Sequence, residues 1–70
     1  MSEVRVQRLA QENAWEDLGE VPGAEMKDAV EQVADGAGIY RSRVAEGDPW
    51  RFFYVNEDGS VIDSGAVSRL

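Results

Sequence analysis

One run of six residues limits how this chain can fold. Residues 50 to 55 read WRFFYV, and the run is followed by Asp58-Gly59, a dipeptide typical of tight hairpin turns. Because neighbouring side chains of a strand point to opposite faces, a strand here is apolar on both faces. A chain of 70 residues has little polypeptide with which to cover both faces of a sheet. The sequence therefore raises the question of what covers the second face.

A helical pattern lies between Gly23 and Asp35. Its apolar residues recur with the 3.6-residue period of an α-helix and form one stripe, made of Met26, Ala29, Val30, Val33 and Ala34. Gly36 is suited to the left-handed conformation that ends many helices. We expect one amphipathic helix from Gly23 to Asp35 that buries Met26, Val30 and Val33.

The segments on either side of this helix have the alternation and the turn signals of β-strands. Residues 15 to 21 fit a strand, although Trp15 and Leu18 would also fit one helical turn. Gln11 to Asn13 form a polar turn before this segment. The five predicted strands cover residues 3–9, 15–21, 39–45, 50–55 and 60–63.

This order predicts an α+β fold: a small, mostly antiparallel sheet of ββαβββ order with one helix across one face. Residues 1 to 70 form a single domain, and residues 64 to 70 are expected to be a flexible tail. A helix of about a dozen residues is about 18 Å long and covers one face only. Either Phe53 and Val55 or the set Trp50, Phe52 and Tyr54 meets the helix. The other set faces outward or contacts another chain.

The composition argues against catalysis. The chain has no cysteine and no histidine, so it lacks disulfides, the usual zinc ligands and the usual base near neutral pH. Residues 56 to 59, NEDG, resemble the middle of a calcium loop. The two anchor positions are Tyr54 and Gly65, where such loops need carboxylates. We expect a protein that is not an enzyme and that has no metal and no cofactor.

The negative charge is concentrated in one segment. The net charge is −7, and residues 11 to 36 contain eight acidic residues against Lys27 alone. This segment repels nucleic acids and favours a basic protein partner. The alternative is a solvated acidic face that keeps a small protein soluble. The aromatic run with its nearby arginines could in principle stack bases, but the overall charge disfavours nucleic acid.

The N-terminus lacks the apolar region of a signal peptide, and the longest apolar run, Phe52 to Val55, is too short to span a bilayer. We expect a soluble, cytoplasmic protein without membrane contact.

Three stretches resemble small uncharacterised open reading frames of phages and GC-rich bacteria. They are WEDLGEV at residues 15–21, DAV at residues 28–30 and GIYR at residues 38–41. The resemblance covers residues 14 to 44 and carries over no functional residue. It implies a phage-type accessory protein, whose usual role is to bind a host protein.

Two functions are compatible with these features. The first is a protein-interaction module, such as a phage-type accessory or inhibitor protein, whose acidic face binds a basic host protein. The residues predicted for this surface are Glu25, Asp28, Glu31 and Asp35. The alternative is a structural homodimer without an outside ligand. Its predicted contact residues are Trp50, Phe52 and Tyr54.

Overall fold

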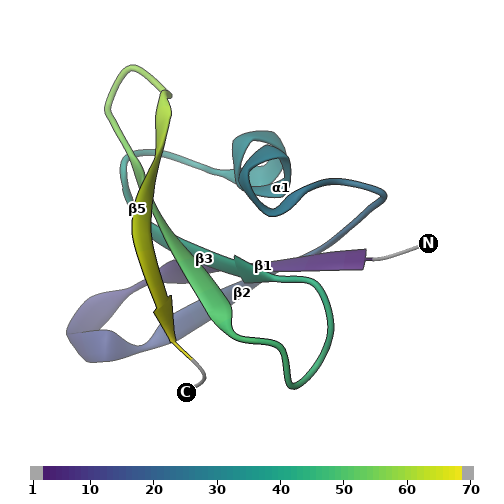
Figure 1. Cartoon of the computed structure of the whole chain (residues 1–70). Helices are drawn as coiled ribbons and strands as arrows, with labels where there is room; N and C mark the ends of the chain where they lie inside the picture. Colours follow the sequence, from purple (N-terminus) through teal and green to yellow (C-terminus); the bar gives the residue numbers. More distant parts are fainter. Residues whose placement is uncertain (1–2, 69–70) are drawn as a thin grey trace.

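The computed structural model describes residues 3 to 68 and confirms a small α+β fold with one α-helix (Figure 1). Its elements are β1 (Glu3–Leu9), β2 (Trp15–Pro22), α1 (Met26–Val33), β3 (Gly38–Arg43), β4 (Trp50–Val55) and β5 (Val61–Ser68), with a short 3-10 turn at Gln11–Asn13. The strands form one sheet in the order β2-β1-β3-β4-β5, and all neighbouring pairs are antiparallel.

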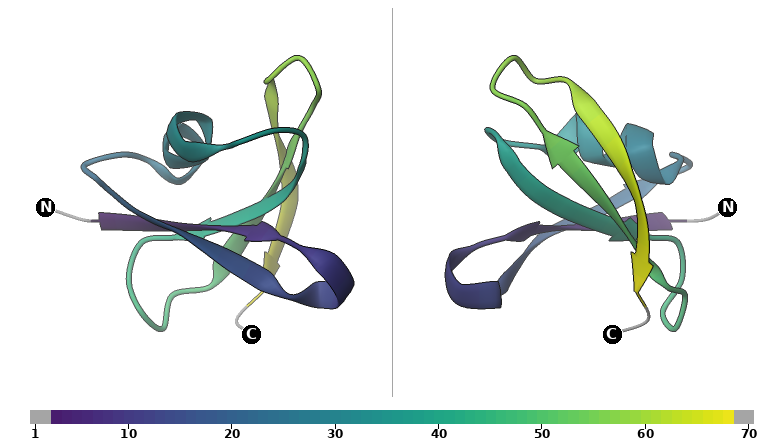
Figure 2. Two further views of the ribbon diagram at one scale, coloured as in Figure 1. Left: turned by 180° about the vertical axis from the view of Figure 1, so that it is seen from behind. Right: turned by 60° about the vertical axis from the view of Figure 1, so that its left-hand side comes forward.

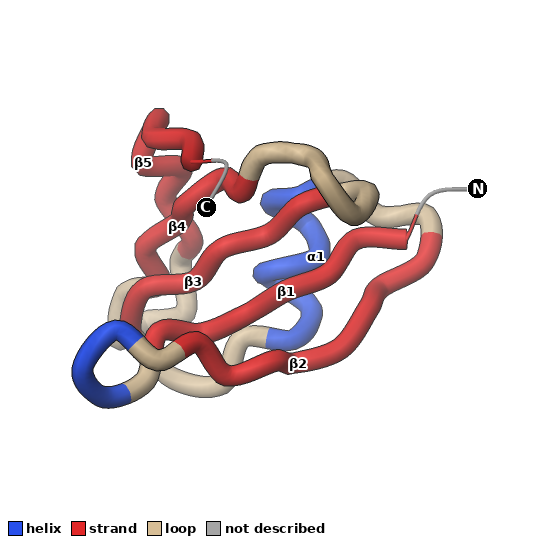
Figure 3. The backbone as a smooth tube through the Cα atoms, turned by 90° about the horizontal axis from the view of Figure 1, so that it is seen from below, coloured by secondary structure: helices blue, strands red, loops and turns tan. Residues whose placement is uncertain are grey.

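Helix α1 lies across one face of this sheet and contacts all five strands (Figure 2). Seen from the opposite side, β3, β1 and β2 lie in front of the helix (Figure 3). Phe53 and Val55 of β4 are buried in the core that the helix covers, so Trp50, Phe52 and Tyr54 belong to the other face. The core between helix and sheet consists of Val4, Val6, Val21, Ala29, Val30, Tyr40, Phe53, Val55 and Val61.

Helix α1 is shorter at both ends than the predicted segment from Gly23 to Asp35. It begins only at Met26, because Gly23 has φ +70° and Glu25 has an extended backbone, and other interactions take over at its C-terminal end. Ala34 already has an extended backbone conformation. The backbone N–H of Asp35 donates to the Tyr40 hydroxyl (3.0 Å), and this hydroxyl donates to the carbonyl of Gly36 (2.8 Å). The buried tyrosine therefore satisfies backbone groups that a longer helix would have paired internally.

The apolar stripe of the helix is buried less evenly than predicted. Ala29 and Val30, in the middle of α1, are fully buried. Met26 and Val33, at its two ends, are only partly buried against the core. A helix of two turns crossing a sheet presses its centre deepest into the core, whereas its ends stay closer to solvent.

Residues 15 to 21 form a strand and not a helical turn. A helical turn would have placed Trp15 and Leu18 on one face, whereas the strand sends them to opposite faces. The register with β1 shifts between Arg5 and Gln7, which leaves Leu18-Gly19 as a bulge. Gly19 has φ +99°, a conformation that residues with a side chain rarely adopt.

Strand β5 is longer than the predicted segment 60–63. It includes residues 64 to 68, which the sequence placed in a tail; the flexibility expected for that tail stays a prediction, and residues 69 and 70 lie outside the described residues. Ser64 and Gly65 interrupt the alternation that a regular strand would show. They are accommodated in an irregularity where the Ser64 hydroxyl donates to the carbonyl of Phe52 (2.8 Å) and Gly65 has φ +78°.

Strand β3 ends at Arg43, two residues before its predicted end. A turn closes directly afterwards, because the Asp48 N–H donates to the Ala45 carbonyl (2.9 Å) and the Ala45 N–H donates to the Asp48 carboxylate (3.1 Å). The turn returns the chain to β4, which begins at the predicted Trp50.

Candidate functional site

The sheet face that points away from α1, called the outer face below, carries three of the aromatic residues of β4. Trp50 is only 4% exposed, Phe52 is half-buried, and Tyr54 is 49% exposed. The three predicted contact residues thus share a face but differ in accessibility. Tyr54 is the one most available to a partner.

Trp50 is buried by arginine side chains. The guanidinium carbon of Arg41 lies 4.1 Å from the centre of the Trp50 ring and 4.2 Å from that of Trp15. Arg43 lies 4.3 Å from the Trp50 ring, and the rings of Trp15 and Phe52 are 5.9 Å apart. Strands β2 and β4 are separated by β1 and β3, so the sheet must coil strongly to bring these rings together. These five residues are called the arginine–aromatic cluster.

The cluster answers the question raised by the aromatic run. Arg41 donates two hydrogen bonds to Oε1 of Gln7, from Nε (2.9 Å) and Nη2 (2.6 Å), which fix its guanidinium over the rings. Burial lowers the pKa of Arg41, and the nearby charge of Arg43 lowers it further. The long apolar stems and flat guanidinium groups cover the second face in place of another polypeptide segment.

The remaining apolar part of the outer face is open to solvent. Ile39, Tyr54 and Ile62 are direct cross-strand neighbours on β3, β4 and β5, so their side chains lie side by side. Ile62 is 51% exposed, similar to Tyr54, and Ile39 is half-buried. These three residues are called the apolar row. It continues the outer face beyond the arginine–aromatic cluster.

The charges of the outer face are largely matched. Arg5 bonds Asp17 through both carboxylate oxygens (2.7 and 2.6 Å) and lies 3.4 Å from the Glu20 carboxylate. The hydrogen bond from Arg5 is the main reason why the pKa of Asp17 is lowered. With Arg41 and Arg43 beside this group, the outer face carries cations and anions together.

The opposite side of the molecule carries the predicted acidic surface. Glu25, Asp28, Glu31 and Asp35 are all exposed, and they are called the acidic side. Asp28 and Glu31 lie within α1, whereas Glu25 precedes it and Asp35 follows it. Among residues 3 to 68, the ion pairs join strands to strands, and none includes a residue of the acidic side.

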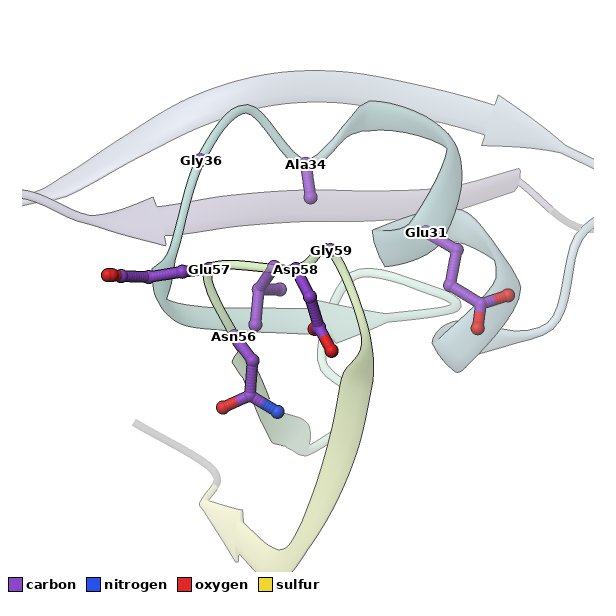
Figure 4. A pocket seen from close by; sticks show the side chains of 8 residues that line it. Glu31, Ala34, Gly36, Asn56, Glu57, Asp58 and Gly59 are labelled. Atoms are coloured by element: carbon purple, nitrogen blue, oxygen red, sulfur yellow. The ribbon is translucent and has the colours of Figure 1, made fainter.

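A shallow depression of about 300 Å³ adjoins the acidic side. It lies between the C-terminal end of α1 and the β4–β5 turn, with Glu31 on the helix side and Glu57 and Asp58 on the turn side (Figure 4). Acidic residues from two distant parts of the sequence therefore border one depression, and the side chains of Glu31 and Glu57 point to opposite sides of it (Figure 4). The sequence carries no local signal that the turn lies beside the helix, because their proximity depends on the path of the β4–β5 hairpin.

In the β4–β5 turn, hydrogen bonds within the turn account for the position of the Asp58 carboxylate. The Asp58 carboxylate accepts hydrogen bonds from the N–H (2.9 Å) and the hydroxyl (2.7 Å) of Ser60, and these bonds lower the pKa of Asp58. Within the described residues, no three acidic side chains converge in a way that could hold a metal ion.

The arginine–aromatic cluster was missed by sequence reasoning, although a signal for it exists. Arg41 and Arg43 are two residues apart in a strand, as are Trp50 and Phe52. Arg41 is paired with Phe52 in the sheet, so the two alternating sets face each other on one surface. The contribution of Trp15, which lies on β2 and is separated from β4 by two other strands, depends on the coiling of the sheet and has no local signal.

Comparison with known proteins gave no match to a family model, to a curated protein or to a solved structure. In the described part of the chain, no helix is both long and apolar enough to cross a membrane.

Proposed function

We propose that this chain is a non-enzymatic protein-interaction module that binds a basic protein through its acidic side. The observation that carries the proposal is the distribution of ion pairs. The arginines Arg5, Arg8 and Arg51 pair with acids of neighbouring strands, whereas the acidic side has no ion pair within residues 3 to 68. Its charges are left directed at solvent, where they attract a cationic surface.

The C-terminal end of α1 is the proposed centre of this contact. The helix dipole places partial negative charge at this end, close to Glu31. The depression beside it is bordered by Glu57 and Asp58. A lysine or arginine side chain of the partner would approach the depression between Glu31 on one side and Glu57 and Asp58 on the other. This geometry favours a protein with a projecting basic side chain over a flat basic surface.

The resemblance to small phage reading frames supports an accessory or inhibitor role for this contact. A compact acidic protein can occupy the surface with which a basic host protein binds its own anionic ligand. Nucleic acid is a poor ligand for the acidic side, because both carry negative charge.

Two variants of equal charge test the proposal. Asp28→Lys/Glu31→Lys reverses two charges of the acidic side, and Glu12→Lys/Glu46→Lys reverses two exposed charges in loops away from it. Each protein is tethered to a matrix and exposed to a bacterial lysate at about 0.15 M salt. We expect a basic protein that the wild type and the loop variant retain and the helix variant loses.

The same capture is repeated at rising salt, where an electrostatic contact should weaken because surface charges become screened. Equal retention by the two variants, or retention that does not change with salt, would rule out the acidic side as the binding surface. Circular dichroism of both variants controls for loss of the fold.

A further inference from the structure

We infer that the outer face of the sheet is a second, separate docking surface, and that its occupant is another copy of this chain, held through Tyr54 and Ile62. This inference is independent of the acidic side and of any basic partner.

The apolar row provides the contact. Tyr54 and Ile62 are each about half exposed, 49% and 51%, and they are direct neighbours across β4 and β5. Ile39 on β3, the cross-strand neighbour of Tyr54, extends the row toward the centre of the sheet. Isolated exposed apolar residues need no explanation, but three adjacent ones on neighbouring strands form a patch that a partner can bury.

The surface beside the row is already ordered. Arg41 is fixed between its contacts to Trp15, Trp50 and Gln7, and Phe52 packs on Trp15. Side chains that are immobile before binding lose little conformational entropy on binding. The arginine–aromatic cluster therefore offers a rigid rim next to the apolar row, with arginine and tryptophan, residue types that are enriched at interface hot spots.

The distribution of charge points to a second copy as the occupant. Two chains that each carry a net charge of −7 repel each other through their acidic surfaces. The outer face is different, because Arg5, Arg41 and Arg43 stand there with Asp17 and Glu20. A face with both signs is self-complementary: in a two-fold arrangement, a cation of one copy can meet an anion of the other.

The size of the face is sufficient. The molecule measures 31 × 23 × 21 Å, and the sheet extends across it. A standard stable interface buries ~800 Å² per partner, so a dimer of this kind would use most of one 31 × 23 Å side of the molecule. Two copies would stack their outer faces and leave both helices, with their acidic sides, pointing away from each other.

Two matched variants of β5 test this surface. Ile62→Lys places a charge in the apolar row. Val67→Lys is the control, because Val67 is equally exposed (53%) on the same strand but lies on the opposite face of the sheet. Val67 pairs with Arg51, which in turn pairs with the buried Ser42, so its side chain points to the face that the helix covers. Sedimentation equilibrium of the full chain, from about 10 μM to about 1 mM, gives the dissociation constant of each dimer.

We expect the wild type and Val67→Lys to dimerise with similar constants and Ile62→Lys to dimerise at least about tenfold more weakly. Tyr54→Ala provides a second variant on the same row, should Ile62→Lys be poorly folded by circular dichroism. Dimerisation of the wild type should strengthen with salt, because screening reduces the repulsion between the two net charges. Binding to a basic protein should weaken under the same conditions, so the two surfaces are distinguishable.

A wild type that stays monomeric throughout this range would overturn the inference, and so would equal dimerisation of all variants. A monomer that instead captures a different protein through Tyr54 and Ile62 would also overturn it, since the outer face would then serve a foreign partner.

Discussion

The guanidinium carbon of Arg41 lies 4.1 Å from the centre of the Trp50 ring, and Trp50 is almost completely buried on a sheet face that no helix covers. Arg41 contacts Trp15 in the same way at 4.2 Å. A small domain thus uses a charged residue to do what a second layer does in larger proteins. Cation–π contacts contribute about 0.5–1 kcal/mol when exposed and about 2 kcal/mol when desolvated, so this arrangement matters for stability.

Replacement of Arg41 by alanine is expected to lower the free energy of unfolding by about 1–3 kcal/mol, because it removes two ring contacts and the hydrogen bonds to Gln7. Arg43→Ala should cost less, since Arg43 contacts one ring only. The stability of Arg41→Lys should lie between those of the wild type and Arg41→Ala, because lysine keeps the positive charge but its ammonium group cannot stack flat on a ring. Urea unfolding followed by tryptophan fluorescence measures all three; equal stability of Arg41→Ala and wild type would contradict the role of the cluster.

The hydroxyl of Tyr40 closes the end of helix α1, and its removal should be costly. Tyr40→Phe leaves the Asp35 N–H and the Gly36 carbonyl without their partner in a partly buried place. We expect a loss of about 1–3 kcal/mol in the free energy of unfolding. Tyr54→Phe is the matched control, because Tyr54 is half exposed, and it should change stability by less than about 0.5 kcal/mol. Similar unfolding midpoints for both variants would disprove this function of Tyr40.

The two valines of α1 should respond differently to the same substitution. Val30 is fully buried, so Val30→Asp places an unpaired charge in the core and should cost roughly 3–5 kcal/mol. Val33 lies at the end of the helix and is only partly buried, so the aspartate of Val33→Asp can reach water and should cost less. Thermal unfolding by circular dichroism ranks the two variants. The reverse order would mean that the helix packs differently.

Much of the fold could be predicted because the local patterns agree with the tertiary structure. The alternation of Val4 and Val6 and the spacing of Ala29 and Val30 predict which face of each element is buried, and these residues are in the core. The end of the helix could not be predicted, because it depends on Tyr40, which approaches it from the next strand. Local propensity carries no information about such a tertiary contact.

The surfaces were predicted less completely than the fold. The exposure of Asp28 and Glu31 follows from the helical period, whereas Glu25 and Asp35 are exposed because they lie just beyond the two ends of the helix. The proximity of the β4–β5 turn to this helix, and that of Trp15 to β4, arises from sheet coiling. Coiling is a property of the assembled sheet and leaves no pattern within a single strand.

The response to acid should be set by carboxylates whose pKa values are lowered in the folded state. The pKa of Asp17 is lowered mainly by its hydrogen bond from Arg5, and that of Asp63 by the Gly65 N–H and by Arg51. Glu3 behaves in the opposite way, because its contact with Glu20 raises its pKa. Lowered carboxylate pKa values favour the fold above the unfolded pKa of about 3.9, and this contribution is lost as the pH falls through the folded value.

Asp17→Asn isolates one of these contributions. Above about pH 5 the wild type should melt at a higher temperature than this variant, because only the wild type has the ionised Asp17 carboxylate that accepts hydrogen bonds from Arg5. The gap should narrow as the pH falls below the ordinary aspartate pKa of about 3.9 and close as it passes the lowered folded-state pKa of Asp17, where the wild type loses its ion pair. Glu46→Gln, a change at an exposed loop residue, serves as the control and should have the same melting temperature as the wild type. Melting curves by circular dichroism between about pH 7 and pH 2 measure the gap. A gap between wild type and Asp17→Asn that stays constant down to the lowest pH would show that the charge of Asp17 does not stabilise the β1–β2 pair.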